Sequence, residues 1–213
     1  KRDGKAASLN EELDDLKMHV GAKDTALAEH LWAGAGCRGF RSTLSWALAG
    51  LGRLGAGLCW AGFALAYLAG VDKIPFERKL FGIYPMRSLV PGHPLMGTQD
   101  DRFFCPQSRH AGLSDAAMES AQRQGRLRLL SHGERGGYTI FETPDQRQLM
   151  HLGHPEYNVR RILGEMERER ARGDVPPPEN FDADQPQTSW RSHRNLLFQQ
   201  WLWFCYQRVS LTA

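Results

Sequence analysis

The sequence predicts an α/β fold in which a mostly parallel sheet is covered by helices on both faces. Strand-like runs occupy residues 126–130, 138–141 and 148–152, and helical runs at residues 60–69 and 158–171 alternate with strands along the chain. Such alternation is typical of α/β proteins. A chain of 213 residues is long enough for one domain whose core needs no disulfide or metal.

Taken in order, the elements fall into an uncertain first part and a clearer second part. A strand is expected to end near Gly57, although the preceding segment is poor in β-branched residues. After the helix at residues 60–69, a connecting segment contains Lys79, and a strand region and a loop follow. A final aromatic-rich helix at residues 190–208 is expected to dock on the body of the domain. We predict a single domain with an N-terminal part at residues 1–56 and a catalytic region at 57–213.

The composition argues against several classes of protein. A net charge of +3 is too small to indicate a nucleic-acid partner. The most apolar region, residues 44–71, is interrupted by glycines and by Arg53, so no membrane span is expected. The cysteines are widely spaced, which argues against a zinc site and a disulfide framework; they are Cys37, Cys59, Cys105 and Cys205. With no signal-peptide pattern, we expect a cytoplasmic protein with reduced thiols.

The segment Gly57-Leu58-Cys59-Trp60-Ala61-Gly62 has the pattern of a nucleophile at a sharp strand-to-helix turn. Small residues on both sides of the cysteine permit the tight backbone that such a turn requires. The amide groups at the start of the following helix favour a thiolate. The alternative is a buried structural cysteine, which is common beside Gly and Ala.

A second candidate pair, His154 and Glu156, follows the strand-like run at residues 148–152. Two residues apart in an extended segment, both side chains can project to the same side. A thiol nucleophile needs a base such as histidine and a carboxylate that orients it. Since reactive groups gather at the carboxyl ends of strands in α/β sheets, we expect Cys59 and His154 at one edge. The spacing equally allows His154 to cap a strand and Glu156 to interact with a helix terminus.

Five motifs, in order, resemble the homoserine O-acyltransferases of the MetA type, which have a class I glutamine-amidotransferase-like, flavodoxin-like three-layer fold. The resemblance covers residues 57–207. The motifs are Leu58-Cys59-Trp60-Ala61, Arg78-Lys79-Leu80-Phe81-Gly82, Asp100-Asp101-Arg102-Phe103 with Pro106-Gln107-Ser108-Arg109, Gly153-His154-Pro155-Glu156-Tyr157, and Ser189-Trp190-Arg191-Ser192-His193 with Asn195-Leu196-Leu197-Phe198 and Trp201.

The resemblance implies an acyltransferase that moves an acetyl or succinyl group from acyl-CoA to the hydroxyl of L-homoserine, the first committed step of methionine biosynthesis. Cys59 would hold the acyl group as a thioester, and His154 would act as the base, oriented by Glu156. The backbone amide of Trp60 would contribute to the oxyanion hole. No metal and no bound cofactor are expected, because acyl-CoA is a co-substrate.

The resemblance also implies substrate-binding roles for Lys79, Ser108 and Arg168. A guanidinium at residue 168 could grip a carboxylate through two hydrogen bonds. It could instead be a solvent-facing arginine paired with Glu165 or Glu169. Lys79 could be an ordinary surface lysine and Ser108 a turn residue after a proline.

The chain departs from the family pattern ahead of residue 57, where we find no Gly-Ala-Pro turn of the kind that helps the family bind its acyl group. The N-terminal part is therefore expected to be truncated or divergent. The acyl donor stays open, with acetyl slightly preferred over succinyl. We expect a homodimer, because the aromatic C-terminal helix offers more apolar surface than one small domain covers.

Three other functions stay open. Serine differs from homoserine by one methylene, which changes binding by only ~1–3 kcal/mol, so a serine O-acyltransferase is a close alternative. A thiol hydrolase of the glutamine-amidotransferase type would use the same Cys59, His154 and Glu156. An inactive binding protein that retains the fold is the alternative outside enzymes.

Overall fold

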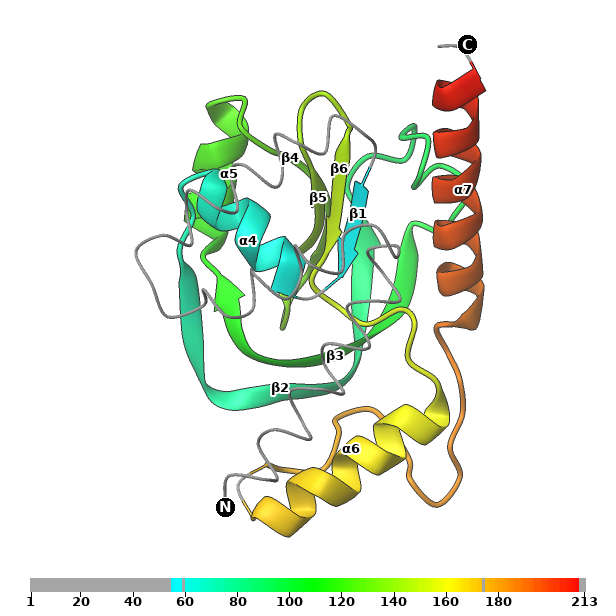
Figure 1. Cartoon of the computed structure of the whole chain (residues 1–213). Helices are drawn as coiled ribbons and strands as arrows, with labels where there is room; N and C mark the ends of the chain where they lie inside the picture. Colours follow the sequence, from blue (N-terminus) through cyan, green and yellow to red (C-terminus); the bar gives the residue numbers. More distant parts are fainter. Residues whose placement is uncertain (1–54, 59, 174, 211–213) are drawn as a thin grey trace, which may run out of the picture. The chain divides into compact units, whose positions relative to one another are not determined.

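The computed structural model describes residues 55–58, 60–173 and 175–210. The chain separates into two compact units, residues 1–53 and 54–213, and the described residues all belong to the second. Most of the predicted N-terminal part at residues 1–56 thus lies outside the described residues, so its predicted divergence stays a prediction. The described elements are β1 (Gly55–Leu58), α4 (Trp60–Leu68), β2 (Lys73–Ser88), β3 (Arg102–Leu113), α5 (Asp115–Arg123), β4 (Arg128–Gly133), β5 (Gly137–Glu142), β6 (Gln148–His151), α6 (Val159–Arg172) and α7 (Arg191–Ser210) (Figure 1).

The strands form one sheet in the order β1-β6-β5-β4-β2-β3. Only β1 and β6 pair in parallel among the described strands, and the other neighbours are antiparallel. The prediction of a mostly parallel sheet is therefore wrong for this part of the chain. The physical reason is connection length: β4 and β5 are joined by the short turn after Gly133, and a parallel pair would need a crossover of a dozen residues or more.

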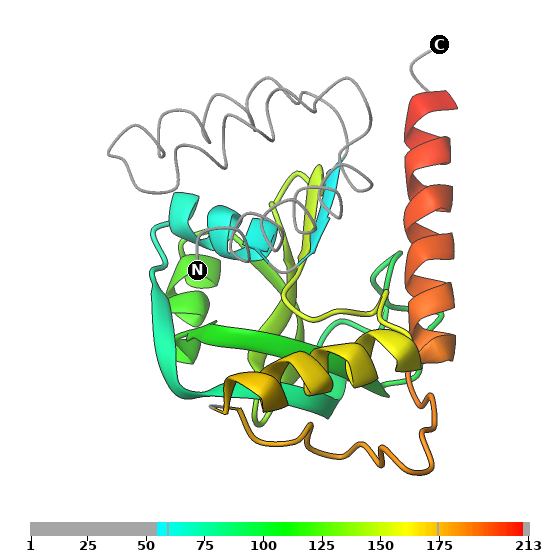
Figure 2. The same ribbon diagram turned by 60° about the horizontal axis from the view of Figure 1, so that its bottom comes forward.

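Helices lie on both faces of the sheet, as predicted (Figures 1 and 2). Ile140 and Phe141 are neighbours on β5 and point to opposite faces. Ile140 belongs to a core cluster that includes Phe204 of α7. Phe141 faces α4, because a Cβ placed on Gly62 would lie 3.7 Å from its ring. Among the described residues, no helix combines the length and apolar character needed to cross a bilayer.

One local prediction and one alternative differ from the structure, and one helix was not predicted. β2 begins at Lys73, so Lys79 lies within a strand rather than in a connecting segment. Ser108 lies inside β3 and is not a turn residue. Helix α5 was not predicted, although Ser114 marks its start as an N-cap whose side chain accepts a hydrogen bond from the Ala117 amide.

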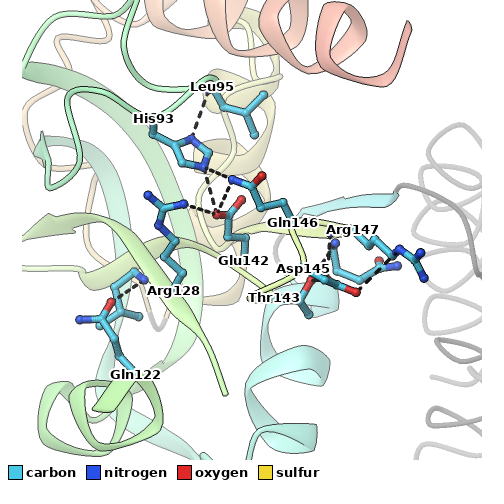
Figure 3. A network of polar contacts seen from close by, with 11 residues as sticks. His93, Leu95, Gln122, Arg128, Glu142, Thr143, Asp145, Gln146 and Arg147 are labelled. Carbon is cyan, nitrogen blue, oxygen red and sulfur yellow. Dashed lines mark hydrogen bonds and ion pairs between the residues drawn. The ribbon is translucent and has the colours of Figure 1, made fainter. Parts of the chain in front are cut away.

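A buried polar network joins the loop after β2 to the hairpin of β5 and β6 (Figure 3). His93 Nε2 lies 3.0 Å from Glu142 Oε1, and His93 Nδ1 accepts a hydrogen bond from the Leu95 amide. Arg128 and Gln146 also approach the Glu142 carboxylate, at 3.5 Å and 3.4 Å. The network satisfies a carboxylate that is almost wholly removed from water.

Candidate active site

The site lies at the carboxyl ends of β1 and β6. These strands are parallel neighbours, with Leu58 opposite His151. β1 ends at Leu58 and α4 begins at Trp60, and Cys59 between them lies outside the described residues. His154 follows three residues after His151. The prediction that the strands before Cys59 and His154 end at one edge of the sheet is therefore confirmed, while the catalytic role of Cys59 stays a prediction.

Gly62 allows α4 to pack closely against the segment that leads to His154. A Cβ on residue 62 would come within 2.5 Å of a side-chain methyl of the buried Leu152. Any larger side chain would therefore push the helix away from β6. This contact gives a packing reason for the small residue at the end of the nucleophile pattern.

His154 and Glu156 form a close pair. Nδ1 of His154 lies 2.6 Å from Oε1 of Glu156, and the two side chains are 13% and 28% exposed. A carboxylate at Nδ1 selects the tautomer in which Nδ1 carries the proton and Nε2 holds the lone pair. This is the arrangement of a general base with its orienting carboxylate.

The backbone around His154 is held by three hydrogen bonds. The His154 amide donates to the carbonyl of Pro106 on β3 at 2.8 Å, and the Tyr157 amide donates to the His154 carbonyl at 3.1 Å. The Gly153 amide donates to Nδ1 of His151 at 2.9 Å. His154 therefore sits on a turn that is anchored to two strands of the sheet.

Gly153 is packed too tightly for a side chain. A Cβ there would lie 2.6 Å from Gln107 Nε2, 2.8 Å from Cys105 Sγ and 3.0 Å from His151 Cε1. Real Cβ atoms do not approach neighbours this closely without displacing them. Glycine at this position thus brings the turn that carries His154 close to the buried side chains of β3 and β6.

Cys105 and His151 make a second cysteine–histidine pair, with Sγ 3.8 Å from Nε2. Because His151 Nδ1 accepts from the Gly153 amide, Nε2 carries the proton and cannot remove one from the thiol. Burial raises the pKa of the Cys105 thiol and lowers the pKa of His151 well below its ordinary value. Both effects keep the pair neutral, so Cys105 has the properties of a structural thiol.

A buried ion-pair cluster brings two predicted substrate-binding residues together. Lys79 Nζ on β2 lies 2.6 Å from both Glu165 Oε1 and Glu169 Oε1 on α6, and its side chain is only 4% exposed. Ser108 on β3 donates a hydrogen bond to Glu165 Oε1. Lys79 is therefore not a surface lysine, and Ser108 is not a turn residue.

The charge balance of this cluster is unusual. Burial alone would raise the pKa of Glu165, but hydrogen bonds from Lys79 and Ser108 outweigh it and lower the pKa. Glu165 is therefore ionised, and its Oε2 is buried without a hydrogen-bond partner in the part of the chain that the structure describes. An anionic oxygen in this position can accept a hydrogen bond from a cationic or hydroxyl group of a ligand.

For Arg168 and Trp60, the structure gives the position in a helix but does not test the predicted role. Arg168 lies on α6 but is exposed, in contrast to the buried Lys79 and Glu165. Trp60 is the first residue of α4, so its backbone amide is at a helix N-terminus, as the predicted oxyanion role requires. Both roles stay predictions.

The sequence reasoning missed Glu165 and Tyr157 as site residues. From the sequence, Glu165 is expected only as a solvent-facing partner of Arg168, because it lies in a run of alternating acidic and basic residues. Tyr157 stacks on the His154 ring, with centroids 4.3 Å apart and an interplanar angle of 26°. Its place in the motif with His154 was the available signal.

No group of His, Cys, Asp or Glu within the described ranges is arranged to hold a metal ion. The described thiols and imidazoles of this region are instead paired with one another, with the Glu156 carboxylate or with backbone groups.

Known proteins resemble this chain over the same region. The profile of the homoserine O-succinyltransferase family matches residues 53–211. A homoserine O-acetyltransferase of Acetivibrio thermocellus is 36% identical over 160 residues, which are 71% of this chain and 52% of that protein. Homoserine O-succinyltransferases of Aeromonas salmonicida and Yersinia pestis are 38% and 39% identical, over 72% and 70% of this chain and 50% of each relative.

Solved structures support the fold. A glutamine amidotransferase from Thermotoga maritima superposes with a TM-score of 0.57 at 13% identity, over 78% of this chain and 67% of that chain. A glutamine amidotransferase from Methylobacillus flagellatus gives a TM-score of 0.51 at 13% identity, over 78% and 66%. The fold is therefore of the glutamine-amidotransferase type, as the sequence motifs implied.

This chain spans about half the length of the curated relatives it matches. The family profile nevertheless covers most of the chain, including β1 and the segment that carries His154 and Glu156. The chain belongs to the homoserine O-succinyltransferase family.

Proposed function

We propose that this chain carries the catalytic residues of a homoserine O-acyltransferase that works through an acyl-thioester on Cys59. The observation that supports the proposal is the parallel pairing of β1 with β6, since the end of β1 at Leu58 and the His154–Glu156 pair then share one edge of the sheet. The names of the relatives support the same reaction class.

In the first half-reaction, His154 Nε2 takes the proton of the Cys59 thiol. The thiolate attacks the acyl-CoA carbonyl, the bond to the CoA sulfur breaks, and the CoA thiolate takes the proton back from His154. In the second half-reaction, His154 removes the proton of the homoserine hydroxyl, whose oxygen attacks the acyl-thioester. The Cys59 thiolate leaves and is reprotonated by His154.

The pair with Glu156 supports both steps, because a carboxylate beside Nδ1 stabilises the imidazolium that forms twice in each cycle. The Trp60 amide, at the start of α4, would stabilise the oxyanion of each tetrahedral intermediate. Thioester and ester exchange needs no metal or redox group, so the proposed reaction uses acyl-CoA and homoserine alone.

The cluster of Lys79, Ser108 and Glu165 is the proposed acceptor site. Homoserine carries an ammonium group, a carboxylate and a hydroxyl, and the cluster offers groups of both charges and a hydroxyl. Arg168 would contribute to the carboxylate. Serine remains an alternative acceptor, because one methylene changes binding by only ~1–3 kcal/mol.

The donor is proposed to be acetyl-CoA or succinyl-CoA, and relatives of both names match this chain to a similar degree. Our slight preference for acetyl is carried over from the sequence. A place at the first committed step of methionine biosynthesis, a homodimeric assembly and a cytoplasmic location complete the proposal.

The test is the intact mass of the protein after mixing with either acyl-CoA in the absence of amino acid. We expect one added acyl group in the wild type and in Cys105→Ala, and none in Cys59→Ala. Homoserine should then discharge the adduct faster than serine. Full acylation of Cys59→Ala would overturn the mechanism, and a folded wild-type protein that accepts neither donor would favour the binding-protein alternative.

A further inference from the structure

The turn that carries His154 is held by two buried side chains as well as by the strands. The Gly153 amide donates to Nδ1 of His151 at 2.9 Å. The His154 amide donates to the Pro106 carbonyl at 2.8 Å, and the Cys105 thiol donates to the same carbonyl at 3.4 Å. Because Cys105 Sγ also lies 3.8 Å from His151 Nε2, one connected set of hydrogen bonds holds the amides of both turn residues.

The chemistry of the donors fixes the direction of every hydrogen bond in this set. A backbone amide can only donate, so Nδ1 of His151 is the acceptor and Nε2 carries the ring proton. Nε2 therefore donates to Cys105 Sγ, and the thiol proton goes to the Pro106 carbonyl, which can only accept. Burial lowers the pKa of His151 and raises the pKa of the Cys105 thiol, so both side chains stay in the neutral forms that this pattern requires.

The bond between residues 151 and 153 has the spacing of an Asx turn, in which an Asn or Asp side chain accepts from the amide two residues later. His151 makes the same turn with an imidazole. It is the last residue of β6 and lies opposite Leu58, the last residue of β1. The turn therefore starts at the level where β1 ends, and a displacement of the turn would move His154 relative to that end.

We propose that His151 is a positioning residue for the acyl transfer, because its ring holds the Gly153 amide and so fixes the turn that places His154 at the end of β1. The inference rests on the proposed function, since it concerns the placement of His154 as the base. It goes further by making both half-reactions depend on a buried ring that takes no proton itself. Cys105 supports this ring, but Cys105→Ala leaves the bond to Gly153 in place and still forms the acyl-enzyme.

The kinetic test compares two substitutions of His151. His151→Leu fills much of the volume and removes the acceptor, whereas His151→Asn is smaller but carries an oxygen that can accept from the Gly153 amide. We expect His151→Leu to lower kcat with homoserine about 100-fold, the effect of a misplaced catalytic group, with KM within about threefold of wild type. His151→Asn should stay within about fivefold of wild type in kcat. Packing alone would favour leucine, so a Leu variant as active as the Asn variant, or a loss confined to KM, would overturn the inference.

His93 provides a matched control. Its Nδ1 accepts from the Leu95 amide in the same two-residue spacing at 3.2 Å, but its ring contacts Glu142 and Gln146, which precede β6. His93→Leu and His93→Asn should both leave kcat per folded molecule within about twofold of wild type. A loss in His93→Leu as large as that in His151→Leu would assign the effect to general stability and overturn the positioning role.

A second measurement needs neither turnover nor a variant. The nitrogen resonances of a histidine ring in NMR spectra distinguish its two neutral tautomers, and the exchange rate of an amide proton reports its hydrogen bond. In the wild type we expect His151 with its proton on Nε2 and a Gly153 amide that is protected from exchange. A proton on Nδ1 at neutral pH, or a Gly153 amide that exchanges as fast as an exposed one, would overturn the inference. If the wild type accepts no acyl group, the proposed function fails, and these two readouts still decide the hydrogen bond on which the positioning role rests.

Discussion

Two histidine–glutamate pairs in this protein have similar contacts and different surroundings. His93 and Glu142 are 3.0 Å apart with side chains 0% and 1% exposed, whereas His154 and Glu156 are 2.6 Å apart with 13% and 28% exposed. The first pair has further partners, Arg128, Gln146 and the Leu95 amide, and it closes the loop after β2 onto the sheet (Figure 3). The second pair lies at the carboxyl end of a strand.

The difference teaches which features separate a structural pair from the proposed catalytic one. In the first pair, Nδ1 of His93 accepts from the Leu95 amide and Nε2 faces the carboxylate, so both ring nitrogens are used within the protein. In the second pair, the carboxylate faces Nδ1, and the tautomer this selects places a lone pair on Nε2. Access and ring orientation, more than the length of the hydrogen bond, are the features on which we propose His154 as the base.

The largest expected effect is on activity. His154→Ala removes the proposed general base and should lower acyl transfer at least ~10³-fold, because base and nucleophile act as a unit. His93→Ala deletes the same ring from the buried pair and should leave the activity per folded molecule nearly unchanged. The measurement is kcat with homoserine, corrected for the folded fraction by circular dichroism. A comparable loss in both variants would remove the distinction between the pairs.

The next largest effect is on stability, and here His93→Ala is expected to cost more than His154→Ala. His93→Ala leaves a cavity and takes a hydrogen-bond partner from a carboxylate that is only 1% exposed. The free energy of unfolding should fall by about 2–4 kcal/mol, whereas His154→Ala, at a more accessible position, should cost about 1 kcal/mol or less. Urea denaturation of the two variants and the wild type measures both values. A larger loss in His154→Ala would mean that the site pair also holds the fold.

How much of this could be predicted from the sequence depends on the range of the interactions. β1, α4 and the edge that carries His154 were predicted, because a cysteine between small residues and the His154–Glu156 spacing are local patterns. The start of β2 was missed, because residues 73–79 are mostly exposed and lack apolar alternation, and their strand conformation depends on pairing with β3.

Local sequence patterns also did not predict the relative direction of the strands or the cluster of Lys79, Ser108 and Glu165. The parallel sheet was predicted from the alternation of helices and strands, yet the turn after Gly133 already signalled an antiparallel hairpin. The contact of Lys79 with Glu165 joins residues 86 positions apart in the sequence. Only the packing of α6 against the antiparallel strands β2 and β3 brings these charges together.

The smallest expected effect concerns a third histidine, His193 of α7, which is packed behind the site and stacks on Phe103 with centroids 3.9 Å apart. Burial lowers its pKa from 6.5 to about 4. Between these two pH values, His193 binds a proton in the unfolded chain and stays neutral in the folded chain. The stabilisation is thus complete above the unfolded pKa and is lost as the pH falls toward the folded pKa.

Urea denaturation between about pH 7 and about pH 4.5 should therefore show a falling free energy of unfolding, with His193 contributing about 1–3 kcal/mol. His151, whose pKa burial also lowers, adds in the same direction. His193→Gln should flatten the pH dependence, because glutamine does not titrate and can still donate to Gln99, the present partner of the His193 ring. An unchanged slope in that variant would assign the acid sensitivity to other groups. Taken with the expected His93 and His154 results, the predicted slope would separate a buried neutral ring, which costs stability in acid, from the more accessible ring of His154, for which we propose a proton transfer.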